Sequence, residues 1–209
     1  MSGKAFIRFG GTCAILAGIV GLLYSVAFLV SARSSDPQLV KTGGMLAALF
    51  LVIGGLLSSA VMAALYDQLK EGEGGFALWA LVLGAVGAAG SAIHGAYDLA
   101  NAINPPTANV PNLADLPSQV DPRGFLTFGA VGLAVLVFSW LIVRGGKMPK
   151  NVGNLGIVLG ILLVVIYLAR LIILDASNPI VVVTVVVTGF IVNPVWNIWL
   201  GVNLRRVGS

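Results

Sequence analysis

The residues best suited to chemistry in this sequence lie in one short stretch that contains a histidine, a tyrosine and an aspartate. His94 and Asp98 are four residues apart, so a helix places them one turn apart on the same face, with Tyr97 beside them. An imidazole beside a carboxylate can exchange protons near neutral pH. The surrounding sequence is apolar, and ionisable groups in such surroundings commonly mark a binding or ion site.

A second polar group lies in a later apolar segment, which contains Tyr167 and Arg170 and ends at Asp175. If both segments cross a membrane in the same direction, His94 and Arg170 lie at a similar depth, about 9 Å outward from the midpoint. Two interpretations remain open. In the first, Arg170 forms a structural ion pair with Asp98 or Asp175. In the second, these side chains line a polar pocket that opens outward, where Arg170 binds an anionic head group or substrate.

A third polar set, Asn193, Pro194 and Asn197, predicts an interruption in the last apolar segment. A proline inside a helix removes one backbone hydrogen bond and can kink the helix, and nearby amide side chains can bond the carbonyl groups that it frees. Such a break forms an ion or substrate site in some transporters. The alternative is a simple kink followed by an aromatic belt at the membrane surface.

Several chemistries are excluded by residue types that are scarce in the sequence. There is one histidine and one cysteine, so a bis-histidine haem, an H-E-x-x-H zinc site, an intramolecular disulfide and a thiolate cluster cannot form. Nucleotide-binding and hydrolase motifs are also missing. We therefore predict no catalytic residues, no metal and no resident cofactor, with His94 as a single axial ligand of a haem or chlorin as the remaining option.

The composition identifies the setting in which these residues act. Hydrophobic residues make up 58% of the 209 and charged residues only 10%, whereas soluble domains carry about 25% charged residues. The mean hydropathy is +0.99. This composition predicts an integral membrane protein.

The 20 charged residues enclose six uncharged runs of 19 to 29 residues. About 20 apolar residues in a helix cross a hydrocarbon core of about 30 Å. The sequence thus predicts an all-α protein, a bundle of six transmembrane helices that forms a single integral membrane domain over residues 1–209. We expect helices at about 9–32, 42–66, 74–98, 124–143, 151–174 and 179–202, and an outer loop at about 101–123, where prolines and asparagines cluster.

The orientation follows from the Lys and Arg residues, which are retained on the cytoplasmic side. With six crossings, eight of the 12 fall on the side that holds both termini and four on the other side. Both termini are therefore predicted to be cytoplasmic. The net charge of +4 then orients the chain in the lipid bilayer and meets anionic lipid, so no nucleic-acid partner is expected.

Glycine is abundant, with 27 residues, and small residues recur at helical spacing. One row contains Gly84 and Ala88, and Gly156 and Gly160 form a G-x-x-x-G pair. Small residues let helix backbones approach closely in a membrane. Such faces serve packing within the chain or contact with another membrane subunit or a second copy of the chain.

The two ends of the chain resemble a known kind of protein. The stretches "RFGGTCAILAGIVGLLYSVAFLV" near the start and "NPVWNIWLGVNLRR" near the end are similar to those of small bacterial six-helix membrane proteins that are grouped as domains of unknown function. The resemblance implies a six-helix bundle in a bacterial inner membrane and a multi-pass location in the cell membrane. It implies no substrate and no site residues.

These observations predict a non-enzymatic integral membrane protein, either a structural or accessory subunit of a membrane complex or a bundle that binds a small ligand or lipid. The alternative is a small transporter or channel that uses His94, Asp98, Arg170 and the Pro194 break. A third class is a membrane enzyme or a single-histidine pigment or haem binder. A transporter needs a water-filled passage between the group of His94, Asp98 and Arg170 and the Pro194 break, whereas a subunit needs a dry interior.

Overall fold

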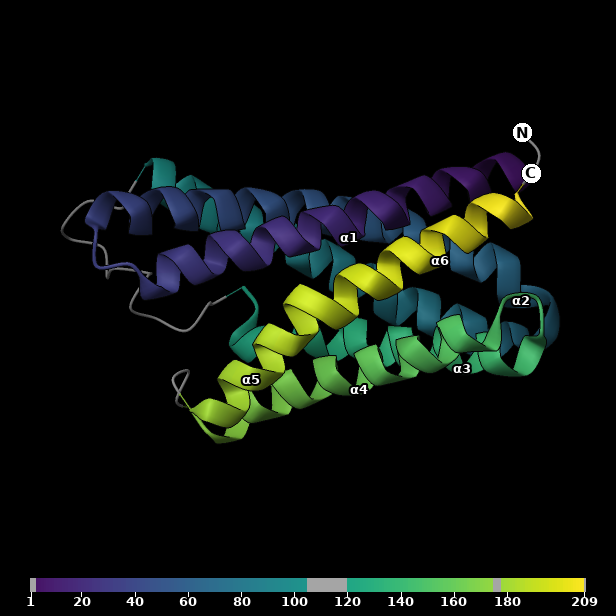
Figure 1. Cartoon of the computed structure of the whole chain (residues 1–209). Coiled ribbons are helices and arrows are strands. Elements are labelled where there is room, and N and C mark those ends of the chain that lie inside the picture. Colours follow the sequence, from purple (N-terminus) through teal and green to yellow (C-terminus); the bar gives the residue numbers. More distant parts are fainter. Residues whose placement is uncertain (1–2, 105–119, 175–177, 209) are drawn as a thin grey trace.

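The computed structural model describes residues 3–104, 120–174 and 178–208, and regular structure in these ranges is entirely helical (Figure 1). Within these ranges, five helices are long and apolar enough to cross a membrane. They are α1 (Gly3–Arg33), α2 (Pro37–Ile103), Phe125–Gly145, α4 (Lys150–Ile172) and Pro179–Val207. The third comprises the π-helical η2 (Phe125–Ala130) and α3 (Val131–Gly145), and the last comprises α5 (Pro179–Val187), the π-helical η3 (Thr188–Val192) and α6 (Asn193–Val207). The all-helical class is confirmed, and the helices are compatible with a multi-pass membrane protein.

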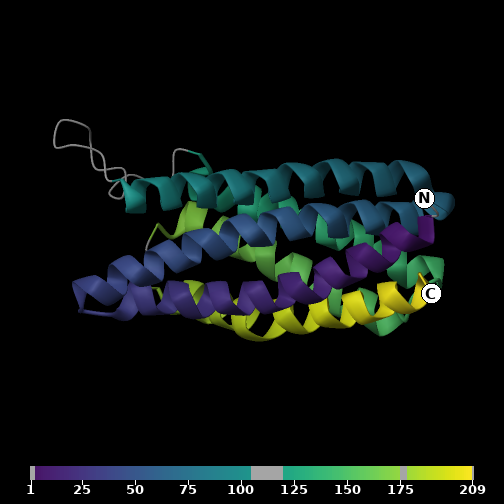
Figure 2. The same cartoon turned by 90° about the horizontal axis from the view of Figure 1, so that it is seen from above.

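Helix α2 turns back on itself. Glu73 has a non-helical backbone (φ −122°, ψ 71°), and the sequence around it, EGEGG, is rich in glycine. A methyl group at Gly55 would lie 2.6 Å from the carbonyl oxygen of Ala88, and one at Gly95 would lie 2.6 Å from that of Ala48. The two arms, residues 37–72 and 74–103, are therefore antiparallel neighbours, as Figure 2 shows. These arms contain the predicted helices 42–66 and 74–98.

The core is apolar and is made by large side chains from several helices. Trp196 of α6, Phe138 of α3 and Leu65 of α2 are among the largest fully buried side chains. The indole N–H of Trp196 donates a hydrogen bond of 3.1 Å to the carbonyl of Val152 in α4. This bond satisfies the one polar atom of a buried tryptophan and fixes α6 against α4.

The glycine rows are used where helices of this chain approach one another. A methyl group at Gly84 would lie 2.7 Å from the Met62 side chain, and one at Gly160 would lie 2.8 Å from the carbonyl oxygen of Gly132. The G-x-x-x-G pair thus packs α4 against α3, as expected when small residues replace bulky ones at helix contacts. Contact with another subunit through Gly and Ala faces stays a prediction.

Both termini lie at one end of the bundle (Figures 1 and 2). We call this end the terminal end, and the opposite end, which carries the turn between α1 and α2, the distal end. The predicted outer loop at about 101–123 falls mainly on residues 105–119, which lie outside the described ranges. The described part of this connection is helical up to Ile103 and resumes with a short 3₁₀ turn, η1 (Pro122–Gly124).

Candidate polar site at the distal end

The structure brings His94 and Asp98 together as their spacing predicts. Nε2 of His94 lies 3.1 Å from Oδ2 of Asp98, one helical turn later in the second arm of α2. The His94 side chain is 16% exposed and that of Asp98 is 49% exposed. Asp98 thus lies at the rim of the site, and the imidazole lies beneath it.

A second carboxylate, which the sequence patterns do not single out, faces the other nitrogen of the imidazole. Oδ2 of Asp121 lies 3.7 Å from Nδ1 of His94, and the Asp121 side chain has no exposed surface. We call His94, Asp98 and Asp121 the polar clasp. The clasp joins α2 to the chain that leads into η2.

Asp121 also holds the start of the next helix. Its carboxylate accepts hydrogen bonds from the backbone N–H groups of Leu126 (2.7 Å) and Thr127 (2.9 Å) and from the Thr127 hydroxyl (2.6 Å). The first N–H groups of a helix have no partner within the helix, so an aspartate just before a helix commonly bonds them. The N-cap residue of η2 is Gly124, which has no side chain to accept these bonds, so Asp121 accepts them from three residues earlier. An aspartate shortly before a predicted helix was the sequence signal that could have revealed this role.

The hydrogen bonds keep Asp121 ionised. Burial raises the pKa of this carboxyl, but contact with His94 and the bonds from Thr127 and Leu126 outweigh burial and lower the pKa to about 2. The Asp121 carboxylate, which lies in the interior of the distal end, is therefore ionised near neutral pH.

A strained turn connects Asp121 to η2 and creates room for a cation. Arg123 (φ 59°) and Gly124 (φ 80°) both have left-handed backbones. A methyl group at Gly124 would lie 2.5 Å from the Phe128 ring and 2.9 Å from Nη1 of Arg170. Only glycine therefore leaves space for the Arg170 guanidinium at this position.

Arg170 lies next to the clasp but outside it. The carbon of its guanidinium group is 5.4 Å from the centroid of the Phe128 ring, a cation–π distance. Among the described residues, no carboxylate lies within 4.0 Å of Arg170, and Asp98 pairs with His94 instead. The expected pairing of Arg170 with Asp98 is therefore not formed, and Asp175 lies outside the described residues.

The tyrosines near the site have different surroundings. Tyr167 packs edge-on against Phe125, with 5.4 Å between ring centroids, and thus supports η2. Tyr97 is half-buried beside Asp98, and the structure gives it no hydrogen bond among the described residues. Tyr24 of α1, which the sequence analysis did not select, lies within electrostatic range of both Arg170 and Asp98.

The site offers a metal or haem little room for coordination. Within the described ranges, no three His, Cys, Asp or Glu side chains lie close enough together to hold a metal ion. Both ring nitrogens of His94 face carboxylate oxygens. A haem or chlorin at His94 would have to displace one of these carboxylates. The single thiol, Cys13, is buried in the apolar core.

The third polar set, Asn193, Pro194 and Asn197, does not break the helix. The backbone N–H of Asn193 bonds the carbonyl of Thr188, one residue further back than in an α-helix, so η3 accommodates Pro194 by a π-helical turn. The Asn197 amide donates to the backbone carbonyl of Asn193 (3.0 Å) and to its side-chain oxygen (2.8 Å). At the predicted interruption the helix is therefore continuous and contains a π-helical turn before Pro194. The Asn193 carbonyl accepts its hydrogen bond from the Asn197 amide.

No protein-family model, curated protein or solved structure matches this chain. The similarity to small bacterial six-helix membrane proteins thus stays a prediction, and the site has to be interpreted from its own geometry.

Proposed function

We propose that this protein is a non-enzymatic membrane bundle that binds a small anionic group, a carboxylate or a phosphate, at Arg170. The observation that carries the proposal is the position of the guanidinium group. It lies against the Phe128 ring in the space left by Gly124, and no carboxylate of the described residues lies within 4.0 Å of it. A guanidinium group in such surroundings binds carboxylates and phosphates through two parallel hydrogen bonds.

The polar clasp supports this proposal by holding the walls of the site. Asp121 bonds the first N–H groups of η2 and contacts His94 of α2. Phe128, which packs against Arg170, belongs to the same η2 segment. The clasp thereby positions Arg170 before a ligand arrives, which lowers the entropic cost of binding.

We further propose that the chain crosses a bacterial inner membrane six times and has both termini in the cytoplasm. Because α2 consists of two antiparallel arms, it would cross the membrane twice, and the five apolar helices would together make six crossings. The termini share one end of the bundle, as an even number of crossings requires, and that end carries eight of the 12 Lys and Arg residues. Arg170 then faces the outer side.

A ligand titration of the protein in mild detergent tests the binding proposal. Inorganic phosphate, acetate and phosphatidylglycerol are added separately, and the unfolding temperature is measured. Binding to the folded protein raises this temperature, and we expect the rise to disappear in Arg170→Gln. A rise with phosphate or acetate indicates a soluble ligand, and a rise with phosphatidylglycerol alone indicates a lipid head group.

The matched control for Arg170→Gln is Arg33→Gln, which removes a cation from the end of α1 at the distal end. It should leave the ligand-dependent rise unchanged. Equal rises in Arg170→Gln and in the unsubstituted protein, or no rise with any probe, would overturn the proposal. Co-purification of another membrane protein with an unresponsive Arg170 would favour an accessory subunit instead.

Transport is the second candidate function, because polar side chains of α1 lie between Arg170 and the polar set around Pro194. A methyl group at Gly21 would lie 2.6 Å from the Asn193 amide nitrogen, and the Ser25 hydroxyl approaches Gly189. Tyr24, on the same stretch of α1, lies within electrostatic range of Arg170. Uptake of a labelled anion into proteoliposomes, lost in Asn193→Leu, would favour transport over simple binding.

A membrane enzyme or a haem or chlorin binder is the third class. An absorbance scan of the protein purified from its native membrane tests the pigment alternative directly. A Soret or chlorin band that disappears in His94→Ala would replace the anion-binding proposal, and a colourless protein would leave it in place.

A further inference from the structure

We infer that the corner of the terminal end where α1 begins and α6 ends binds an anionic phospholipid from the adjacent leaflet. The inference rests on a surface hollow, on the charge around its mouth and on the length of its apolar wall. It concerns the end of the bundle opposite to Arg170 and does not depend on the ligand proposed there.

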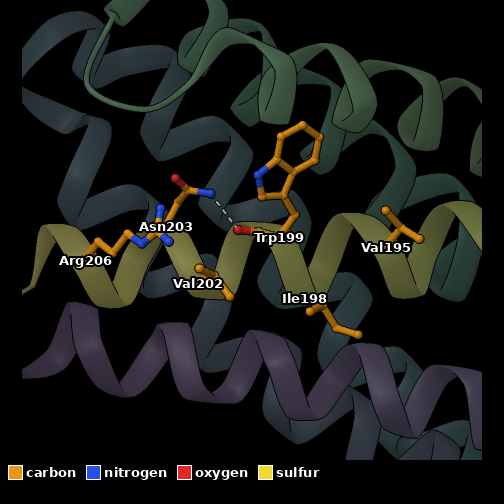
Figure 3. A pocket seen from close by; sticks show the side chains of 6 residues that line it. All are labelled: Val195, Ile198, Trp199, Val202, Asn203 and Arg206. Carbon is orange, nitrogen blue, oxygen red and sulfur yellow. Dashed lines mark hydrogen bonds between the residues drawn. The ribbon is translucent and has the colours of Figure 1, made fainter.

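The hollow is lined by residues of α6 alone, whose side chains Figure 3 shows. Its volume is about 470 Å³, and its wall is formed by Val195, Ile198, Trp199, Val202, Asn203 and Arg206. In Figure 3, Ile198 and Val202 project toward α1, and Trp199 projects to the opposite side. The Asn203 amide donates a hydrogen bond of 2.8 Å to the backbone carbonyl of Trp199. The apolar side chains therefore line the part of the hollow that is farther from the C-terminus, and the polar side chains of Asn203 and Arg206 line the part nearest to it.

Arg206 lines the hollow, and three further basic residues lie at the same end of α1 and α6: Lys4, Arg8 and Arg205. Close helix contacts bring them together. A methyl group at Gly208 would lie 2.8 Å from the carbonyl oxygen of Lys4 and 3.0 Å from the backbone nitrogen of Arg8, and one at Gly11 would lie 2.8 Å from Cγ of Arg205. All four side chains are exposed. We call them the basic corner.

Three acidic residues near the terminal end pair with cations outside the basic corner, although the Asp67 carboxylate also lies 3.1 Å from the position of a methyl group at Gly3, at the start of α1. Asp67 contacts Lys70 at 2.5 Å, Glu71 contacts Lys147 at 2.6 Å, and Glu73 contacts Arg144 at 3.3 Å. Each of these three carboxylates is thus neutralised by a cation outside the basic corner.

The basic corner keeps an excess of positive charge as a result. In the described part of the chain, Lys4, Arg8 and Arg205 have no carboxylate within 4.0 Å. Basic residues near a membrane surface attract anionic lipids by about 1 kcal/mol each, a factor of about five in affinity. The corner therefore selects a negatively charged head group.

The length of the hollow fits an acyl chain. Val195 and Arg206 are 11 residues apart along α6, which is about 16 Å at 1.5 Å per residue. Half of a hydrocarbon core is about 15 Å. A lipid whose phosphate meets the basic corner would thus reach the membrane midplane along this wall, and Trp199 lies between, as interfacial tryptophans do. A soluble anion would leave the apolar wall unused.

Native mass spectrometry of the full chain in mild detergent tests the inference with dioleoyl-phosphatidylglycerol and dioleoyl-phosphatidylcholine as the two probes. We expect the unsubstituted protein to bind the anionic lipid at least tenfold more tightly. The double variant Arg8→Gln with Arg205→Gln should weaken phosphatidylglycerol binding by about 25-fold, fivefold for each cation, and leave phosphatidylcholine binding unchanged.

Two further variants separate this site from general attraction and from misfolding. Lys150→Gln removes an exposed cation from the same end but outside the corner, and it should retain binding. Val202→Trp keeps every charge but fills the hollow, and it should weaken binding of both lipids. Equal affinity for the two lipids, or equal losses in Lys150→Gln and the double variant, would overturn the inference. Arg170→Gln should have no effect on this site, so failure of one proposal leaves the other standing.

Discussion

Nδ1 of His94 lies 3.7 Å from the carboxylate of Asp121, and this contact ties the second arm of α2 to the turn that starts η2. The same carboxylate accepts two backbone N–H bonds and one hydroxyl bond from the first turn of η2. Asp121 therefore links α2 to the start of η2, although its side chain has no exposed surface through which to meet a ligand.

Replacement of Asp121 by alanine should destabilise the protein by about 3 kcal/mol, because it leaves the part-buried N–H groups of Leu126 and Thr127 without their acceptor and removes the carboxylate that faces His94. Thermal unfolding in detergent measures the change. Asp98→Ala is the control, since Asp98 is half exposed and forms an ion pair only with His94 among the described residues, and it should cost less than about 1 kcal/mol. Similar losses in the two variants would contradict the central role of Asp121.

Acid should weaken the distal end in a defined range of pH. The pKa of Asp121 falls from 3.8 in the unfolded chain to about 2 in the folded one. A lowered pKa adds stability that is complete above about pH 4 and is lost as the pH falls toward 2. The size is about 2 kcal/mol, from about 1.4 kcal/mol for each pKa unit. Unfolding of the native protein and of Asp121→Asn should be compared from pH 6 to pH 2. The difference between them should shrink in this window, and a constant difference would show that Asp121 does not titrate there.

The helices were predictable because charged residues end each apolar run, and a helix in lipid satisfies its own backbone. The contact of His94 with Asp98 was predictable for a similar local reason, since both residues lie on one helix. Asp121 was missed because its partners depend on how the chain turns before η2. The π-helical turn that accommodates Pro194 also could not be foreseen, because it depends on which carbonyl the N–H of Asn193 reaches.

Gly124→Ala should impair both folding and the proposed anion site. The methyl group would meet Phe128 and Arg170, and a left-handed backbone costs a non-glycine residue about 1 to 2 kcal/mol. Gly146→Ala is the matched control, because Gly146 also has a positive φ (66°) but open space around it. We expect Gly146→Ala to lose about 1 kcal/mol and Gly124→Ala to lose more. Only Gly124→Ala should also lose the rise in unfolding temperature produced by the anionic ligand. Equal behaviour of the two variants would show that the space at Gly124 does not matter to Arg170.

The proposed six crossings can be tested by labelling introduced cysteines in intact cells with a membrane-impermeant maleimide. Cys13 is buried, so the native thiol should contribute little background. Gly74→Cys lies in the turn of α2, where open space surrounds the glycine. Ser35→Cys lies in the exposed turn between α1 and α2, at the distal end. We expect Ser35→Cys to react in intact cells and Gly74→Cys to react only after the membrane is permeabilised. Reaction of both residues in intact cells would contradict the doubled-back path of α2 through the membrane, and the reverse pattern would invert the orientation and place Arg170 toward the cytoplasm.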